Sequence, residues 1–143
     1  ARVLTAAGFA VVACDDRPGT LTPEWVPNVY DRRLVDYKNL SERCPIGPRD
    51  LVVVATAGHK SDIDVVIQAM RAKPAYLGCL GSRRKTAFVR ARLEQEGFTQ
   101  EQIDELHLPI GVAIEAEDPE EIAISIAAEM IHLRRTKLIP RKR

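Results

Sequence analysis

The stretch DLVVVATAGHKSD, residues 50–62, constrains the fold of this chain more than any other. It opens with an unbroken apolar run that is rich in valine, which predicts a β-strand covered on both faces. A glycine and a polar turn follow, and Ile63, Val66, Ile67 and Met70 then recur at the spacing of one helix face. A buried strand that leads directly into a helix is the repeating unit of parallel α/β proteins.

The same alternation of strands and helices continues along the chain. Helices are expected over residues 1–9, 61–73, 82–97, 99–106 and 118–135, and strands over 10–16, 32–37, 50–58 and 75–81. Residues 108–114 are expected to form a short strand or an extended segment. This order predicts an α/β domain, a Rossmann-like doubly wound parallel sheet in three α/β/α layers. Because residue 1 already lies in a helix, we expect the first strand and the Gly-rich turn of such a fold to be missing. The expected organisation is an N-terminally incomplete domain over 1–136 and a basic tail over 137–143.

Polar residues mark the start of four of these helices. Ser61, Ser82, Thr99 and Asp118 are the predicted N-caps, because their side-chain oxygens can accept hydrogen bonds from the amide groups of the first turn. Glu121 follows Asp118 at the spacing of a capping box.

The charges are distributed unevenly, although the net charge is only +1. Residues 134–143 carry six Lys and Arg side chains and no acid, and residues 94–121 carry ten acids and no Lys or Arg. A basic tail can contact nucleic acid or acidic lipid, but no aromatic residues alternate with its charges, so a frayed terminus is the favoured interpretation and nucleic acid is not the expected partner. No apolar run reaches the length of about 18 residues that a membrane span needs, so none is expected.

Three cysteines, Cys14, Cys44 and Cys79, are widely spaced and form no CxxC pair. This predicts neither a disulfide framework nor a zinc site, and it suits a reducing cytoplasm. Cys14 and Cys79 lie in apolar runs and are expected to be buried. The alternative for Cys79 is a thiol whose pKa is lowered by the cationic helix start that follows it. No Ser/His/Asp or Cys/His arrangement for nucleophilic catalysis is legible.

Asp15, Asp16 and Arg17 form the first of three candidate ligand sites, each at a strand end where α/β proteins bind ligands. In a dinucleotide fold, an acid at this place accepts hydrogen bonds from the ribose hydroxyls. A strand that simply turns polar at the surface explains the residues equally well.

Gly58 and His59 form the second candidate, because a strand, a glycine and a helix start place backbone N–H groups at a ligand crevice. His59 is a candidate proton carrier or polar contact, and a solvated loop histidine is the alternative. It has no partner at helical spacing, which argues against a metal site.

The third candidate is the glycine-rich, cationic stretch GCLGSRRK. Its candidate contacts are Gly78, Gly81, Ser82, Arg83, Arg84 and Lys85. Three cations in the first turn of a helix are unfavourable for the helix dipole, and an anionic ligand would remove that conflict. The alternative is that these cations pair with the acidic segment 94–121.

Five segments, taken in order, resemble the C-terminal Rossmann-like domain of the XdhC/CoxI family: VVACDDRPG, VVVATAGHKSD, AYLGCLGSRRK, LPIGVAI and DPEEIAISIAAEMI. Members of this family are accessory factors of molybdenum hydroxylases such as xanthine dehydrogenase and carbon monoxide dehydrogenase. The resemblance covers about residues 9–135, and GCLGSRRK followed by PIG and PEEIA is its most specific part. The chain departs from the family at Ile114-Glu115-Ala116, where members usually read Ile-Gly-Ala.

The resemblance implies an accessory factor rather than a catalyst. Such a protein binds the molybdenum cofactor (molybdopterin), a pterin that carries a phosphate and a dithiolene, and aids its sulfuration and insertion into an apo-enzyme. The implied partner is a molybdenum hydroxylase apo-enzyme, with a sulfurtransferase and a second copy of the chain as further candidates. The family pattern falls on Asp15, Asp16, Arg17, Gly58, His59, Gly78, Gly81, Ser82, Arg83, Arg84 and Lys85. An NAD(P)-binding oxidoreductase and a non-catalytic dinucleotide-binding regulatory module are the alternatives.

Overall fold

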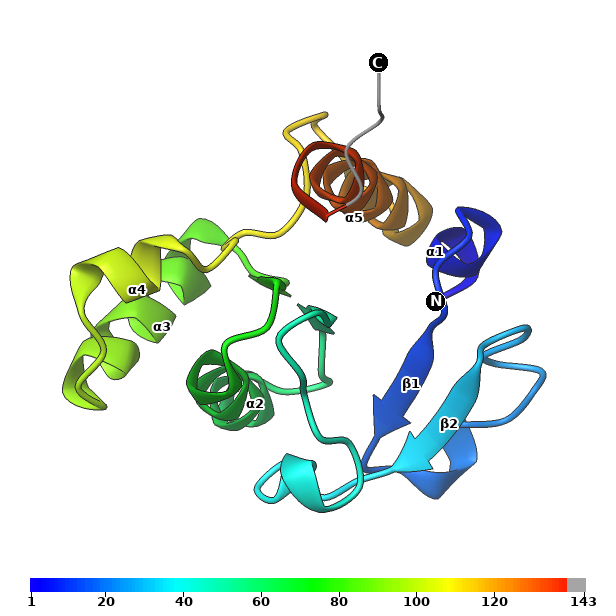
Figure 1. Ribbon diagram of the computed structural model, residues 1–143, viewed down its shortest axis with the longest axis horizontal. Coiled ribbons are helices and arrows are strands. Elements are labelled where there is room, and N and C mark those ends of the chain that lie inside the picture. Colours follow the sequence, from blue (N-terminus) through cyan, green and yellow to red (C-terminus); the bar gives the residue numbers. More distant parts are fainter. Residues whose placement is uncertain (139–143) are drawn as a thin grey trace. The chain divides into compact units, whose positions relative to one another are not determined.

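The computed structural model describes residues 1–138, apart from the side chain of Arg83. Its helices and parallel strands confirm the predicted α/β class (Figure 1). The chain divides into two compact units that are interlaced in sequence. Unit 1 comprises residues 1–13, 22–32 and 111 onward, and unit 2 comprises residues 14–21 and 33–110. Every predicted site residue belongs to unit 2.

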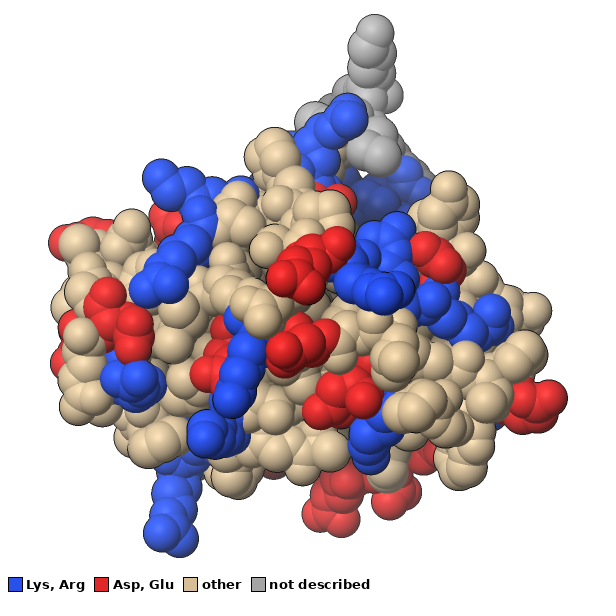
Figure 2. All heavy atoms as spheres, turned by 90° about the horizontal axis from the view of Figure 1, so that it is seen from below, with Lys and Arg blue, Asp and Glu red and all other residues tan. Residues whose placement is uncertain are grey.

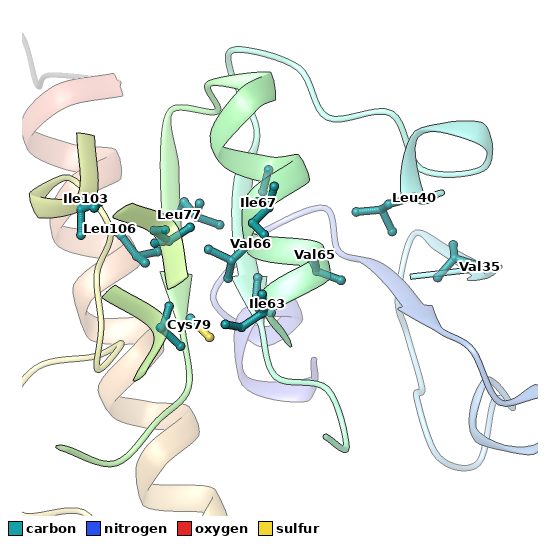
Figure 3. Packing of buried hydrophobic residues seen from close by; sticks show 14 residues of the cluster. Val35, Leu40, Ile63, Val65, Val66, Ile67, Leu77, Cys79, Ile103 and Leu106 are labelled. Atoms are coloured by element: carbon teal, nitrogen blue, oxygen red, sulfur yellow. The ribbon is translucent and has the colours of Figure 1, made fainter. Parts of the chain in front are cut away.

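The core of unit 2 surrounds β3 (Leu51–Val54) and β4 (Tyr76–Cys79). The two strands run parallel, with Leu51 opposite Tyr76 and Val54 opposite Cys79. The helix that connects them, α2 (His59–Ala72), packs against both. Figure 3 shows side chains of α2 between those of β4 and those of Val35 and Leu40. Burial on several sides, rather than helix propensity alone, therefore stabilises α2.

Two helices follow β4 in unit 2, α3 (Arg83–Gln95) and α4 (Gln100–Asp104). Ser82 is the N-cap of α3, and its hydroxyl accepts a hydrogen bond from the Lys85 amide, as predicted. Thr99 begins α4 with a complete capping box. Val89 and Leu93 of α3 and Ile103 of α4 are buried, so both helices present apolar side chains to the interior.

Unit 1 contains α1 (Arg2–Ala6), α5 (Pro119–Leu133) and the π-helical turn η3 (Arg134–Leu138). The predicted capping box of α5 is present, formed by Asp118 and Glu121. The helices α1 and α5 contact one another. The Arg134 guanidinium donates to the carbonyl of Ala7 at 3.1 Å and lies 4.1 Å from the centre of the Phe9 ring. Of the predicted tail 137–143, residues 139–143 lie outside the described part of the chain.

A second pair of strands, β1 (Val12–Asp15) and β2 (Asp31–Leu34), forms its own two-stranded sheet. The Tyr30 amide donates to the Val11 carbonyl and the Val35 amide to the Asp15 carbonyl, so these strands also run parallel. Short 3-10 turns follow each of them, η1 (Pro18–Thr20) and η2 (Leu40–Glu42). Within the described residues, the ladders of β1–β2 and β3–β4 remain separate.

The start of α2 differs from the prediction. Gly58, in extended conformation, is the N-cap, so the assignment of Ser61 was wrong by about one turn. The reason is Asp62, whose carboxylate accepts hydrogen bonds from the Thr56 amide and hydroxyl, both at 2.8 Å. These bonds fold the loop after β3 back onto the first turn, and the helix begins before Ser61.

Of the two expectations for residues 108–114, a short strand or an extended segment, the strand was wrong. The Ile110 amide donates to the Cys79 carbonyl of β4 at 3.1 Å, but the donors around it form no ladder. Pro109 has no N–H, the Gly111 amide donates to the Glu129 carboxylate at 2.7 Å, and the Val112 amide donates to the Ser125 carbonyl at 3.3 Å. Gly111 has φ of +98°, which favours glycine. One isolated parallel bridge, between Gly78 and His107, precedes the segment.

Candidate functional site

The carboxyl ends of β3 and β4 each lead into the N-terminus of a helix, α2 and α3. Two side chains tie these helix starts together. The Lys85 ammonium of α3 contacts the Asp62 carboxylate of α2 and the carbonyl of Leu80, which follows β4. Because Asp62 also holds Thr56, the ion pair joins both strand ends and both first turns. Two positive helix ends therefore converge on one place.

This ion pair is internal. The Lys85 side chain is only 9% exposed and that of Asp62 only 2%. The charge of Lys85 is thus matched inside the protein, and Lys85 is a poor candidate for direct contact with an anionic ligand. Sequence reasoning missed Asp62. The available signal was an acid directly before the apolar stripe of a buried helix, where an unpaired carboxylate would be costly.

The two glycines of GCLGSRRK make room for neighbouring side chains. Gly78 is buried in β4, and a Cβ atom there would lie 2.4 Å from Cδ1 of Ile110. A Cβ at Gly81 would lie 3.0 Å from Cδ of Lys85 and 3.2 Å from Cδ1 of Leu108. Gly78 therefore permits close packing, and Gly81 leaves a path for the Lys85 side chain toward Asp62.

At the N-terminus of α3, the N-cap Ser82 and the first-turn residue Arg84 are exposed. The first hydrogen bond of the α3 ladder runs from the Thr86 amide to the Ser82 carbonyl at 2.9 Å. The amides of residues 83 and 84 therefore precede the ladder, as expected at a helix N-terminus. The side chain of Arg83 lies outside the described part of the structure.

At the N-terminus of α2, the N-cap Gly58 and the first helical residue His59 are exposed. The Thr56 hydroxyl oxygen, which also lies 2.9 Å from the Gly58 carbonyl oxygen, helps to fix this turn. The first ladder bond of α2 runs from the Asp62 amide to the Gly58 carbonyl at 3.0 Å. The amides of residues 59–61 therefore precede it, and a helix N-terminus of this kind can donate to an anion.

Asp15, Asp16 and Arg17 form a separate, internally paired cluster at the end of β1. Arg17 Nε lies 2.9 Å from Asp15 Oδ1, and a terminal guanidinium nitrogen lies 3.0 Å from Oδ2. Hydrogen bonding to Arg17 lowers the pKa of Asp15. Burial, with the nearby carboxylates of Asp15 and Asp16, raises the pKa of Tyr37 to about 12. Both Asp15 oxygens are thus engaged, which reduces their capacity to accept hydrogen bonds from a ribose.

The acidic segment 94–121 pairs with cations from further along α3, not from the described side chains of its first turn. Arg90 pairs with Asp104, and Arg92 Nη2 lies 2.8 Å from Glu96 Oε1. Figure 2 shows Lys and Arg side chains interspersed with Asp and Glu on the displayed face. The exposed Arg84 therefore stays available at the helix start.

Cys79 is fully buried at the end of β4. Its burial raises the pKa of the thiol from near 9 to about 11, outweighing the effect of Lys85. The expectation of burial is confirmed for Cys79, whereas Cys14 is only half-buried. The alternative of an activated Cys79 thiol was wrong. Within residues 1–138, no group of three or more His, Cys, Asp and Glu side chains is arranged to hold a metal ion. No helix in that same range is long and apolar enough to cross a membrane.

Three proteins of known sequence are similar to this chain. YqeB of Escherichia coli is 32% identical over 128 residues, which are 89% of this chain and 23% of YqeB. The molybdenum cofactor insertion chaperone PaoD of Escherichia coli is 29% identical over 105 residues, which are 73% of this chain and 33% of PaoD. A probable xanthine dehydrogenase subunit of Bacillus subtilis is 28% identical over 128 residues, which are 90% of this chain and 37% of the Bacillus protein.

A solved structure has the same fold. The crystal structure of a xanthine dehydrogenase from Bacillus halodurans matches with a TM-score of 0.82 and 28% identity, over 99% of this chain and 40% of that one. The chain thus spans well under half the length of each of these proteins. The model of the XdhC Rossmann domain matches residues 1–130. Because that match covers nearly the whole chain, the chain belongs to the XdhC family and is a Rossmann domain of that family.

Proposed function

We propose that this domain is part of an accessory protein of molybdenum hydroxylases and that it binds the phosphate of the molybdenum cofactor. The observation that carries the proposal is the convergence of the N-termini of α2 and α3, tied by Asp62 and Lys85. PaoD, to which the chain is similar, is named as an insertion chaperone for this cofactor. The apo-hydroxylase is the proposed recipient.

Backbone amides supply most of the proposed phosphate contacts. The first turns of α2 and α3 carry amides that precede the hydrogen-bond ladders, and each helix dipole favours an anion by about 0.3–1 kcal/mol. The Lys85–Asp62 pair has no net charge, so it positions these amides without itself attracting the ligand. Arg84, which is exposed beside them, supplies the net positive charge. This donor set fits a phosphate.

The predicted site residues take different parts in this proposal. Gly58, His59, Gly81, Ser82, Arg83 and Arg84 form the phosphate-binding turns. Lys85 and Gly78 support these turns from inside the protein. Asp15, Asp16 and Arg17 stay a prediction for contacts to the rest of the ligand.

The proposal is tested by charge reversal at Arg84. Arg84→Glu in the full-length protein should weaken the binding of molybdenum cofactor by about tenfold or more, because it replaces a charge-assisted donor with a repelling carboxylate. The measurement is an equilibrium dissociation constant for cofactor freshly released from a purified molybdenum enzyme.

Arg49→Glu is the matched control, since Arg49 is exposed and precedes β3, at the opposite end of that strand from the proposed site. The control should bind as the wild type does. Equal affinities for wild type and Arg84→Glu would show that Arg84 does not take part in binding the cofactor. Parallel titrations with NADH and NADPH address the dinucleotide alternative, which requires saturable binding of one of them.

A further inference from the structure

Two of the three cysteines meet in unit 2, although 30 residues separate them in sequence. Cys14 lies in β1 and Cys44 lies shortly after η2. The Cys14 thiol donates a hydrogen bond to Cys44 Sγ, and the two sulfur atoms are 3.2 Å apart. A disulfide requires about 2.05 Å, so a movement of roughly 1 Å would join them.

The surroundings of Cys44 favour its thiolate form. The hydrogen bond from Cys14, together with the charge of Arg33 and a hydrogen bond from it, lowers the pKa of Cys44 to about 6. Burial and the Asp50 carboxylate act in the opposite direction but are weaker. These contacts favour the thiolate form of Cys44, with Cys14 as the thiol that donates to it.

Cys44 lies at the wall of a surface hollow. It lines a hollow of about 180 Å³, whose other walls are Leu40, Ser41, Ile46, Gln68, Arg71 and Ala72. Both cysteines are half-buried, and both also pack against the hydrophobic core of unit 2. Packing explains their burial, and the 3.2 Å approach of the two sulfur atoms, with the charge of Arg33 acting on Cys44, is a further feature.

We propose that Cys14 and Cys44 are a redox-active dithiol, which closes to a reversible disulfide by exchange with a low-molecular-weight disulfide. With oxidised glutathione, the Cys44 thiolate attacks one sulfur, a mixed disulfide forms and one glutathione thiolate leaves. Cys14 then gives its proton to the departing glutathione and its sulfur attacks Cys44 Sγ, which releases the second glutathione. Two protein thiols are oxidised, and one glutathione disulfide is reduced to two thiols.

The test uses the full-length protein, oxidised glutathione at neutral pH and peptide mass spectrometry without reduction. The wild type should yield a peptide pair joined through Cys14 and Cys44, which dithiothreitol separates. Cys14→Ser should instead accumulate glutathione on Cys44, because the resolving thiol is missing. Cys44→Ser should form neither product, and Cys79→Ser should behave as the wild type.

A readout that does not depend on disulfide closure is the rate of iodoacetamide labelling. In the wild type, Cys44 should be labelled at least about tenfold faster than Cys79 at pH 7. The labelling rate of Cys44 should rise with pH and have its midpoint near pH 6. In Cys14→Ser that midpoint should move upward. The proposal is overturned if Cys14 and Cys44 remain reduced in the wild type, if Cys14→Ser collects no glutathione on Cys44, or if Cys44 and Cys79 label equally fast.

Discussion

At the scale of single residues, Lys85 shows that a cation placed unfavourably at a helix N-terminus can be neutralised by an acid inside the protein. Three cations at the start of α3 oppose its dipole, and the sequence alone suggests an external anion. The structure gives Lys85 a buried partner, Asp62, from a helix that begins more than 20 residues earlier. The local sequence around Lys85 does not predict this partner, because the contact depends on how two βα units lie side by side.

Removing the lysine should therefore cost more stability than removing its exposed neighbour. Lys85→Met leaves the Asp62 carboxylate buried without its cation and should lower the free energy of unfolding by about 3–5 kcal/mol. Arg84→Met should change it by less than about 0.5 kcal/mol. Urea unfolding followed by circular dichroism measures both. Adding Asp62→Asn to Lys85→Met should restore part of the loss, and a Lys85→Met protein as stable as Arg84→Met would refute the structural role.

At the scale of elements, the helices are predicted well because their signals are local. Thr99 and Asp118 each begin a helix with both bonds of a capping box, and Ser82 caps α3, as their sequences indicate. The errors arise where distant groups take the backbone donors. Thr56 is held by Asp62 at the start of α2, and Gly111 is held by Glu129. The apolar pattern over 108–114 indicates burial but not these partners.

The corrected start of α2 can be tested against a true cap. Thr99→Ala removes the hydroxyl that accepts from the Gln102 amide and should cost about 1 kcal/mol of stability. Ser61→Ala should change stability by only a few tenths of a kcal/mol, because Gly58 and not Ser61 is the N-cap. The two single variants are compared by chemical unfolding. If Ser61→Ala lowered the free energy of unfolding as much as Thr99→Ala does, Ser61 rather than Gly58 would be the N-cap of α2.

At the scale of the whole molecule, the class of fold follows from the sequence, but the neighbours of each strand do not. Apolar runs locate β1, β3 and β4, and the alternation with helices predicts parallel pairing, which the register of β3 and β4 confirms. Which strands share a ladder depends on contacts between distant segments, and the described strands pair as β1–β2 and β3–β4. The phosphate site is likewise only partly predictable, since its turns are local features and its supporting ion pair is not.

Global stability should also respond to alkaline pH through Cys79. Burial raises the pKa of this thiol from near 9 to about 11, so between these values the unfolded chain loses a proton that the folded protein retains. The contribution of Cys79 is complete below pH 9 and falls as pH rises toward 11. The difference in unfolding free energy between wild type and Cys79→Ala should therefore narrow over this range. A difference that stays constant would show that the thiol does not titrate in this way.

The interlacing of the two units has a consequence for how the chain is completed during synthesis. The chain passes between the units four times, after residues 13, 21, 32 and 110. All of unit 2 has therefore been translated by residue 110, after α1 and before α5, the two helices of unit 1 that contact one another. The strand ends and helix starts around Asp62 and Lys85 are therefore all synthesised before α1 has its partner helix.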